Sequence, residues 1–182
     1  AYSAYRERSL GLGAMGFHSY LQQQGVNFEG LQATGINYQI FKKINKKAKS
    51  ASKKLCEVRG AYPDSSDNVY RNAHLLAIAP NASSSIICGN TSPSIEPVRA
   101  NVYTHKTLSG SFQVKNKNLQ KLFDDKKITK KEQDKLWKQI FSDNGSVKNL
   151  KILSKEEKEI FKTADEINQI WIIEHAYKRQ EF

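Results

Sequence analysis

The chain has 182 residues and 38% hydrophobic content, a length and composition that suit one domain or part of one. Its formal net charge is +11, and it contains only two cysteines, too few for a disulfide framework. No stretch approaches the roughly 18 apolar residues of a membrane span, and the first residues lack the order of a secretory signal. We therefore expect a soluble chain of the reducing cytoplasm with no membrane contact.

A glycine-rich stretch near the start, RSLGLGAMGFHSYLQQQG, has the spacing Gly11-x-Gly13-x-x-Gly16. Dinucleotide-binding loops share this spacing, but no strand precedes it and no acidic residue closes a βαβ unit about 20 residues later. Glycine also allows two backbones to approach more closely than a Cβ atom would permit. We therefore predict close packing for these glycines, followed by a short helix that stops at Gly25.

A long helix is predicted from about Thr34 to Arg59, ending at Gly60. Within it, the run FKKINKKAKSASKK places apolar side chains on one stripe and lysines elsewhere. That pattern describes a packed helix with a solvated face as well as it describes a nucleic-acid contact. After a turn, the short apolar run Ala73–Ala79 has the length and flanks of a buried strand.

The stretch APNASSSIICGNTSPSIEP then places three serines just before a short apolar segment. Proline, small polar residues and the apolar IIC describe a loop that enters a helix. The free N–H groups of a helix start bind anions, and small side chains let a phosphate reach them. A cap formed by Ser83 or Ser84 explains the same residues. From the residues alone, a helix cap and a phosphate cradle remain equal alternatives.

Three capping boxes of the form Ser/Thr-x-x-Glu predict helix starts at Thr129, Ser154 and Thr163. The first opens the helical stretch KKEQDKLWKQIF, and the third opens ADEINQIWIIEHAYKRQ. A turn at Asn144-Gly145 follows the first of these helices. The C-terminal third is therefore predicted to be helical.

The titratable side chains show no catalytic or metal-binding pattern. No group of His, Cys, Asp or Glu has the spacing of a metal site, so we expect no metal in this chain. Glu96 has no second titratable group at a fixed spacing, which favours a structural role.

The stretches PNASSSIICGNTSPSIEP and RANVYTHKTLSGSFQVKNKNLQKL resemble the catalytic barrel of the large subunit of class I ribonucleotide reductase, of the eukaryotic and T4-like phage type. RSLGLGAMGF resembles the family's R-x-x-G-I-G-V-x-G segment, and SDNGSV resembles its Asn-Gly-Ser turn. The resemblance implies an α/β fold, a helix-rich part of the ten-stranded α/β barrel. Residues 1–182 would form the C-terminal portion of that barrel domain, incomplete at both ends, and Ala73–Ala79 would be one of its strands.

In the family, the matching serine loop grips the diphosphate of the ribonucleoside diphosphate substrate. The resemblance therefore favours the phosphate cradle and implies a binding role for Asn81, Ala82, Ser83, Ser84 and Ser85. Asn81 departs from the threonine or serine that is frequent in the family at this position. The backbone donors beside it are thus the firmer part of the prediction.

The resemblance also implies radical reduction of the ribose 2′-hydroxyl, which makes deoxyribonucleotides for DNA replication. A cysteine thiyl radical abstracts the 3′-hydrogen, an asparagine and a glutamate assist, and a cysteine pair supplies electrons. The family carries these catalytic residues before or after the stretch that this sequence matches, so we expect none here and no turnover by this chain alone. Cys56 and Cys88 match no catalytic cysteine, and we expect both to pack.

The implied partners are the remainder of the large subunit, in the same chain or as a separately encoded piece, and the small subunit with its dimetal and tyrosyl radical cofactor. Thioredoxin or glutaredoxin would reduce the complete enzyme. The alternative function is that of a basic, non-enzymatic nucleic-acid-binding protein, which rests on the +11 charge and the lysines at 42–54 and 115–138. Few arginines, and aromatic residues on apolar stripes, count against it. A degenerate remnant with a structural role is the third possibility.

Overall fold

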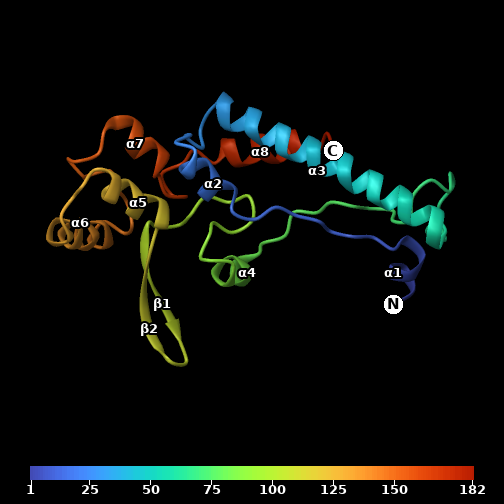
Figure 1. Cartoon of the computed structure of the whole chain (residues 1–182), viewed down its shortest axis with the longest axis horizontal. Coiled ribbons are helices and arrows are strands. Elements are labelled where there is room, and N and C mark those ends of the chain that lie inside the picture. The colour runs from blue at the N-terminus through green and yellow to red at the C-terminus, as the bar shows by residue number, and fades with distance from the viewer.

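The structure, a computed structural model, describes all residues from 1 to 182. Figure 1 shows an elongated molecule, with one long helix, α3, along one side and short helices grouped at the opposite end. A hairpin projects away from the body (Figure 1). In chain order the elements are α1 (Tyr2–Glu7), α2 (Phe17–Gln23), α3 (Leu31–Arg59), α4 (Ala82–Ile87), β1 (Val102–Thr107), β2 (Gly110–Lys115), α5 (Lys117–Asp125), α6 (Lys130–Ser142), α7 (Lys155–Ile160) and α8 (Ile170–Arg179).

The predicted long helix is confirmed as α3, although it begins three residues earlier than expected. Gly30 precedes its first turn, and the Thr34 hydroxyl donates to the Gly30 carbonyl at 3.1 Å, as a residue inside a helix does. The helix ends as predicted at Gly60, whose φ of 74° suits glycine and whose N–H donates to the Cys56 carbonyl. None of the helices has an apolar stretch long enough to cross a lipid bilayer.

The apolar side chains form two separate clusters. The larger joins β1 to α5, α6 and the segments that follow, and consists of Val102, Leu119, Phe123, Trp137, Ile140, Val147, Leu150, Leu153 and Phe161. The smaller lies between α2 and the start of α3, and consists of Phe17, Leu21, Val26, Phe28, Ala33 and Ile167. The chain therefore has two separate core clusters.

Two of the three capping boxes are confirmed. Thr129 accepts from the Glu132 N–H at the start of α6, Ser154 accepts from the Glu157 N–H at the start of α7, and each glutamate reaches back to the N-cap backbone. The turn at Asn144-Gly145 is also confirmed, with φ of 55° and 87°.

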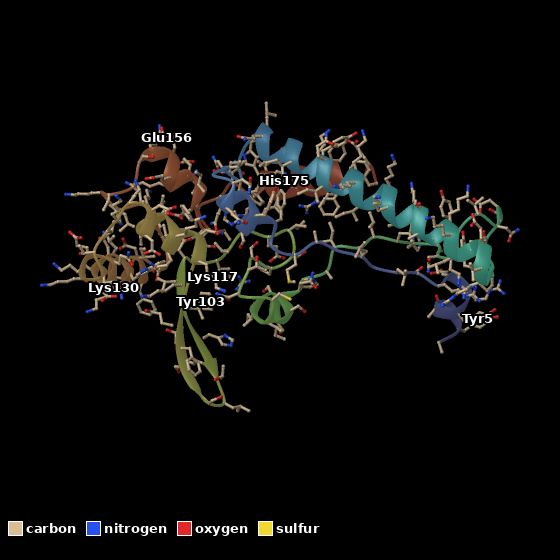
Figure 2. The ribbon with its side chains drawn as sticks, in the orientation of Figure 1. Tyr5, Tyr103, Lys117, Lys130, Glu156 and His175 are labelled. Carbon is tan, nitrogen blue, oxygen red and sulfur yellow. The ribbon has the colours of Figure 1, made fainter.

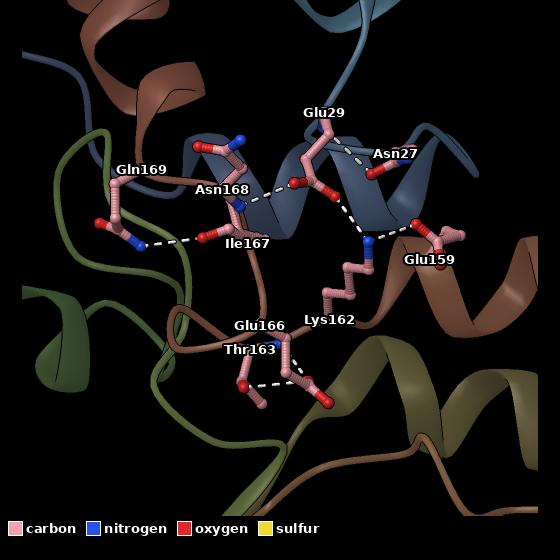
Figure 3. A network of polar contacts seen from close by, with 9 residues as sticks. All are labelled: Asn27, Glu29, Glu159, Lys162, Thr163, Glu166, Ile167, Asn168 and Gln169. Atoms are coloured by element: carbon pink, nitrogen blue, oxygen red, sulfur yellow. Dashed lines mark hydrogen bonds and ion pairs between the residues drawn. The ribbon is translucent and has the colours of Figure 1, made fainter.

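The third predicted helix start, at Thr163, is wrong because α8 begins at Ile170. Thr163 and Glu166 do make the capping-box contact, at 2.8 Å from the Thr163 N–H to the carboxylate, but the Ser146 hydroxyl also donates to Glu166. The Asn168 N–H donates to Glu29 at 2.7 Å, which holds the next residues in a turn (Figure 3). Because of these tertiary hydrogen bonds, the helix begins more than one turn later than predicted.

The expected strand Ala73–Ala79 is extended but is not a regular strand. It makes one parallel bridge, Leu12 with Leu76, and none of its residues is buried, so the expectation of a buried strand is wrong. The only sheet is the antiparallel β1–β2 hairpin, in which Val102 pairs with Lys115 and Thr107 pairs with Gly110. The apolar run predicted an extended backbone correctly. This backbone pairs along one edge only, with the N-terminal segment.

Candidate functional site

The serine loop forms the start of the short helix α4. Asn81 is its N-cap, with φ 51° and ψ 27°, and makes no side-chain cap hydrogen bond. The Ser85 hydroxyl donates to the Ala82 carbonyl at 2.7 Å and is buried, whereas Ser83 and Ser84 are exposed and their hydroxyls make no hydrogen bond. The alternative in which Ser83 or Ser84 caps the helix is therefore wrong.

The first-turn N–H groups of α4 are also free. The first backbone bond across the turn runs from the Ser85 N–H to the Asn81 carbonyl at 2.9 Å, so the three residues between them donate to no backbone acceptor. Free N–H groups at a helix start, next to unpaired hydroxyls, form a set of donors for an anionic ligand.

A cavity of about 670 Å³ borders one side of this turn. Of the five predicted residues, Ala82 and Ser85 line it, while Asn81, Ser83 and Ser84 do not. The remaining lining residues are Ser19, Pro80, Ile86, Asn90, Thr91, Pro93, Glu96, Val98, Arg99, Ala100, Tyr103 and Asn116. The five residues are contiguous in sequence, but the helix turn spreads them over different faces.

Several polar residues of this cavity were not predicted as site residues. The Tyr103 hydroxyl donates to the Asn90 side chain at 2.7 Å, and burial raises the pKa of the phenol although that hydrogen bond opposes the shift. Asn116 caps α5 and donates to the Asn101 side chain at 2.8 Å. Figure 2 places Tyr103 and Lys117 where the hairpin joins α5. The only sequence clue to Tyr103 and Asn116 was that they follow the serine loop in the chain.

Exposed charges of both signs border the cavity. Glu96 and Arg99 both line it and are both exposed, and neither forms an ion pair within the chain. Lys117 lies close to Gly89, just beyond the C-terminal end of α4. An anion in the cavity would thus have one cationic side chain, Arg99, on its wall.

The early glycines hold this region in place by close approach, as predicted. A Cβ atom at Gly13 would lie 2.8 Å from the Ala77 carbonyl oxygen, and one at Gly16 would lie 2.6 Å from the Thr91 hydroxyl. Gly16 also has φ 83° and donates its N–H to the Ser92 carbonyl at 2.8 Å. At Gly16 both the space and the backbone angle disfavour a side chain, whereas at Gly13 the space alone does.

A buried histidine ties the end of the same loop to α2. The Val98 N–H donates to Nδ1 of His18 at 3.1 Å, and burial lowers the pKa of His18 to about 4. The ring is therefore neutral at pH 7 and its Nδ1 can accept. Ser19 and Ser92 exchange two further hydrogen bonds, at 3.1 and 2.8 Å, between α2 and the loop.

Neither cysteine lies in the cavity. Cys56 is half-buried and its thiol donates to the Asn68 carbonyl at 3.3 Å, while Cys88 is exposed at the end of α4. The expectation that Cys88 packs is wrong, because α4 itself has little protein around it. The structure contains no group of three or more His, Cys, Asp or Glu side chains placed to hold a metal ion.

The comparisons with known proteins point to one family. The model described as "Ribonucleotide reductase, barrel domain" matches residues 1–70 and 65–182. The ribonucleoside-diphosphate reductase large subunit of Invertebrate iridescent virus 6 is 46% identical over 182 residues, which cover 99% of this chain and 19% of that protein. The large subunit of Invertebrate iridescent virus 3 is 45% identical over 181 residues, covering 100% of this chain and 29% of the relative.

A solved structure supports the same assignment. The Actinobacillus ureae class Id ribonucleotide reductase alpha subunit superposes with a TM-score of 0.88 and 39% identity, covering 99% of this chain and 32% of that one. The chain thus spans between 19% and 32% of the length of these relatives. It belongs to the family of ribonucleotide reductase large subunits and corresponds to part of their barrel domain.

Proposed function

We propose that this chain contributes the substrate diphosphate-binding loop, Asn81–Ser85, to the large subunit of a ribonucleoside-diphosphate reductase. The observation that carries the proposal is the first turn of α4, where free N–H groups stand beside the unpaired hydroxyls of Ser83 and Ser84. An uncapped helix start with small side chains offers these donors to a phosphate group.

The binding energy follows from the donors. Hydrogen bonds to a charged group contribute about 1.5–3 kcal/mol each, and a nearby helix start adds about 0.3–1 kcal/mol. The cavity beside Ala82 would hold the part of the substrate that follows the phosphates, with Tyr103 and Asn116 on its wall. Fixing the diphosphate would orient the ribose relative to the reacting groups.

The chemical steps belong to other parts of the enzyme. The two cysteines lie outside the site, and the described residues do not fit a dimetal centre, so no radical or metal step is assigned to this chain. We propose that the remainder of the large subunit supplies the catalytic cysteines, that a small subunit supplies the radical, and that thioredoxin or glutaredoxin supplies the electrons. The assembled enzyme would work in the cytoplasm.

The test uses the complete large subunit that contains this sequence, assayed with its small subunit. Ser83→Leu and Ser84→Leu fill the space next to the free N–H groups, and each is expected to raise the KM for the nucleoside diphosphate about 10- to 100-fold. Ser50→Leu, at an exposed position of α3, is the matched control and should leave KM unchanged.

An unchanged KM in both loop variants, with folding intact, would remove the diphosphate assignment. The loop would then have a structural role, as expected of a degenerate remnant. Binding of inorganic diphosphate by calorimetry separates the two cases, because a structural loop has no reason to lose diphosphate affinity on substitution.

The charge of α3 favours a second candidate function, nucleic-acid binding. All seven of its lysines are exposed and none forms an ion pair: Lys42, Lys43, Lys46, Lys47, Lys49, Lys53 and Lys54. A polyanion on this face would bind with an affinity that falls steeply as salt increases. Gel-shift titrations of the complete subunit with single-stranded DNA at two salt concentrations test it, and no binding at low salt would exclude it.

A further inference from the structure

Residues 81–91 carry the serine loop and α4, and one hydrogen bond joins this segment to the rest of the chain. The backbone hydrogen bonds of the segment all stay inside it, and so does the bond that the Ser85 hydroxyl donates. The exception is the Tyr103 hydroxyl, which donates to the Asn90 side chain at 2.7 Å. No ion pair reaches the segment either. Tyr103 therefore makes the only polar contact of this segment with the rest of the chain.

Apolar packing adds little to this contact. Ser85 is the only buried residue of α4, while Ile86 and Ile87 are 39% and 85% exposed. Asn90 follows the C-terminal end of the helix, and its own N–H donates to the Ile86 carbonyl at 3.1 Å. Its φ of 61° lies in the left-handed region, which asparagine tolerates better than most residues. Fixing the Asn90 side chain therefore fixes the last turn of α4.

Tyr103, in contrast, is attached to the larger core cluster. Its neighbour in β1, Val102, is 2% exposed and belongs to that cluster. Asn101 is fully buried, and it donates its N–H to the Gly145 carbonyl at 3.0 Å and its side chain to the Phe161 carbonyl at 2.8 Å. The start of β1 is therefore held firmly by the core, and the phenol of Tyr103 connects it to the end of α4.

The phenol and the amide suit this connection chemically. Burial raises the pKa of Tyr103, so its hydroxyl keeps its proton and donates throughout the pH range around neutrality. Tyr103 and Asn90 are both half-buried, which partly shields their hydrogen bond from water and strengthens it. Both residues line the cavity of about 670 Å³ that Ala82 and Ser85 also line. The connection therefore lies on the same cavity as the serine loop.

We propose that Tyr103 is a positioning residue for the diphosphate loop. Its hydroxyl holds Asn90, and with it α4, at a fixed place relative to the larger core cluster, so that the free N–H groups of the first turn meet the diphosphate. Since α4 is a short helix of six residues, an anchor at its C-terminal end also sets the place of its N-terminal end. The inference rests on the proposed function, and adds to it the residue that orders the donors before substrate binds.

The first test measures the order of the loop without substrate, by amide hydrogen exchange in the complete large subunit. Tyr103→Phe keeps the ring and removes the donor, and should speed the exchange of residues 82–91 about 5- to 10-fold. Asn90→Gly removes the acceptor and suits the left-handed φ, and in that background Tyr103→Phe should have no further effect. Tyr70→Phe is the matched control, because the Tyr70 phenol is also half-buried but makes no hydrogen bond, and it should leave this exchange unchanged.

The second test is the kinetics of the complete enzyme, with the same variants. Tyr103→Phe should raise the KM for the nucleoside diphosphate about 5- to 10-fold and leave kcat unchanged, because the loop binds the diphosphate equally in the ground state and the transition state. In the Asn90→Gly background, Tyr103→Phe should raise KM no further. An equal increase in that background would overturn the proposal in favour of a direct contact between Tyr103 and the substrate.

The two tests together separate this inference from the proposed function. Unchanged exchange in Tyr103→Phe, or a KM that Ser83→Leu raises and Tyr103→Phe does not, would overturn the role of Tyr103 alone. If neither variant changes KM, the diphosphate assignment itself falls. Faster exchange in Tyr103→Phe would then reduce Tyr103 to a structural anchor of α4.

Discussion

The segment from Val102 to Phe161 and the segment from Gly60 to Asn90 differ in how they bury apolar surface. The first contains a cluster of nine buried hydrophobic residues shared by β1, α5, α6 and the turns that follow. In the second, the only buried residues are Asn72 and Ser85, while Ile78 and Ile87 are 55% and 85% exposed. The first segment completes its own core, whereas the second leaves its apolar side chains exposed or half-buried.

The proposed functional groups lie on the incomplete side. The proposed diphosphate loop belongs to it, and two cavities border it. A ligand can be bound only by groups that remain accessible, and groups buried in a completed core are not accessible. Substitutions in the two segments should therefore differ in whether they change stability or binding.

The largest stability effect is expected in the self-contained segment. Trp137 is 2% exposed and its indole N–H donates to the Gln120 side chain at 3.1 Å. Trp137→Ala should cost about 3–5 kcal/mol of unfolding free energy because it leaves a large cavity. Calorimetry of the complete large subunit measures it, with Ile87→Ala on α4 as the exposed counterpart. Equal costs at both positions would show that the remainder of the subunit covers α4 as fully as Trp137 is covered here.

Acid should weaken the junction between α2 and the site loop. His18 has a folded pKa of about 4 and an ordinary unfolded value, so its stabilising contribution is complete above about pH 6.5 and is lost as the pH falls toward 4. The loss amounts to about 3 kcal/mol. In His18→Asn, whose side-chain oxygen still accepts from Val98, the unfolding free energy should fall less between pH 6.5 and 4. Identical pH profiles of the two proteins would contradict the buried neutral ring.

Two glycines with similar backbone angles should respond differently. A Cβ atom at Gly145 would lie 2.3 Å from the Cβ of Ala100, and φ is 87°. Gly145→Ala should therefore cost about 2–3 kcal/mol, from strain and from the clash. At Gly25, φ is 66° and nothing lies within 4 Å, so Gly25→Ala should cost only about 1 kcal/mol. Equal thermal shifts would mean that the backbone angle alone sets the cost.

The smallest stability effect separates capping residues from binding residues. Thr129→Ala removes a capping box from α6 and should cost about 1 kcal/mol. Ser83→Ala should change stability by less than about 0.5 kcal/mol, because this serine does not cap α4, while it weakens diphosphate binding. A stability loss at Ser83 as large as that at Thr129 would contradict the assignment of its hydroxyl to a ligand.

Local patterns predicted much of the fold. The end of α3 at Gly60, the starts of α6 and α7 and the turn at Asn144-Gly145 all depend on residues close in sequence, and all are confirmed. The predicted start of a helix at Thr163 failed because residues from distant parts of the chain bind the same turn: Ser146 donates to Glu166, and Glu29 accepts from the Asn168 N–H (Figure 3 shows the Glu29 contact). No pattern within a window of a few residues contains that information.

The candidate site shows the same division. The serine loop was found from its own residues and from its resemblance to a family, and only the structure excluded a cap by Ser83 or Ser84, because the N-cap is Asn81. Tyr103 and Asn116 were missed as cavity residues because they come from β1 and from the start of α5. Side chains on separate elements meet only when the elements pack.

By itself, the sequence determined the local structures and membership of the reductase large-subunit family. These depend on backbone angles, short-range hydrogen bonds and motif order, which are written along the chain. Only the tertiary structure decided which edge of residues 73–78 is paired and which serines keep free hydroxyls. Those outcomes depend on contacts between residues far apart in sequence, because burial and hydrogen-bond satisfaction are properties of the packed molecule.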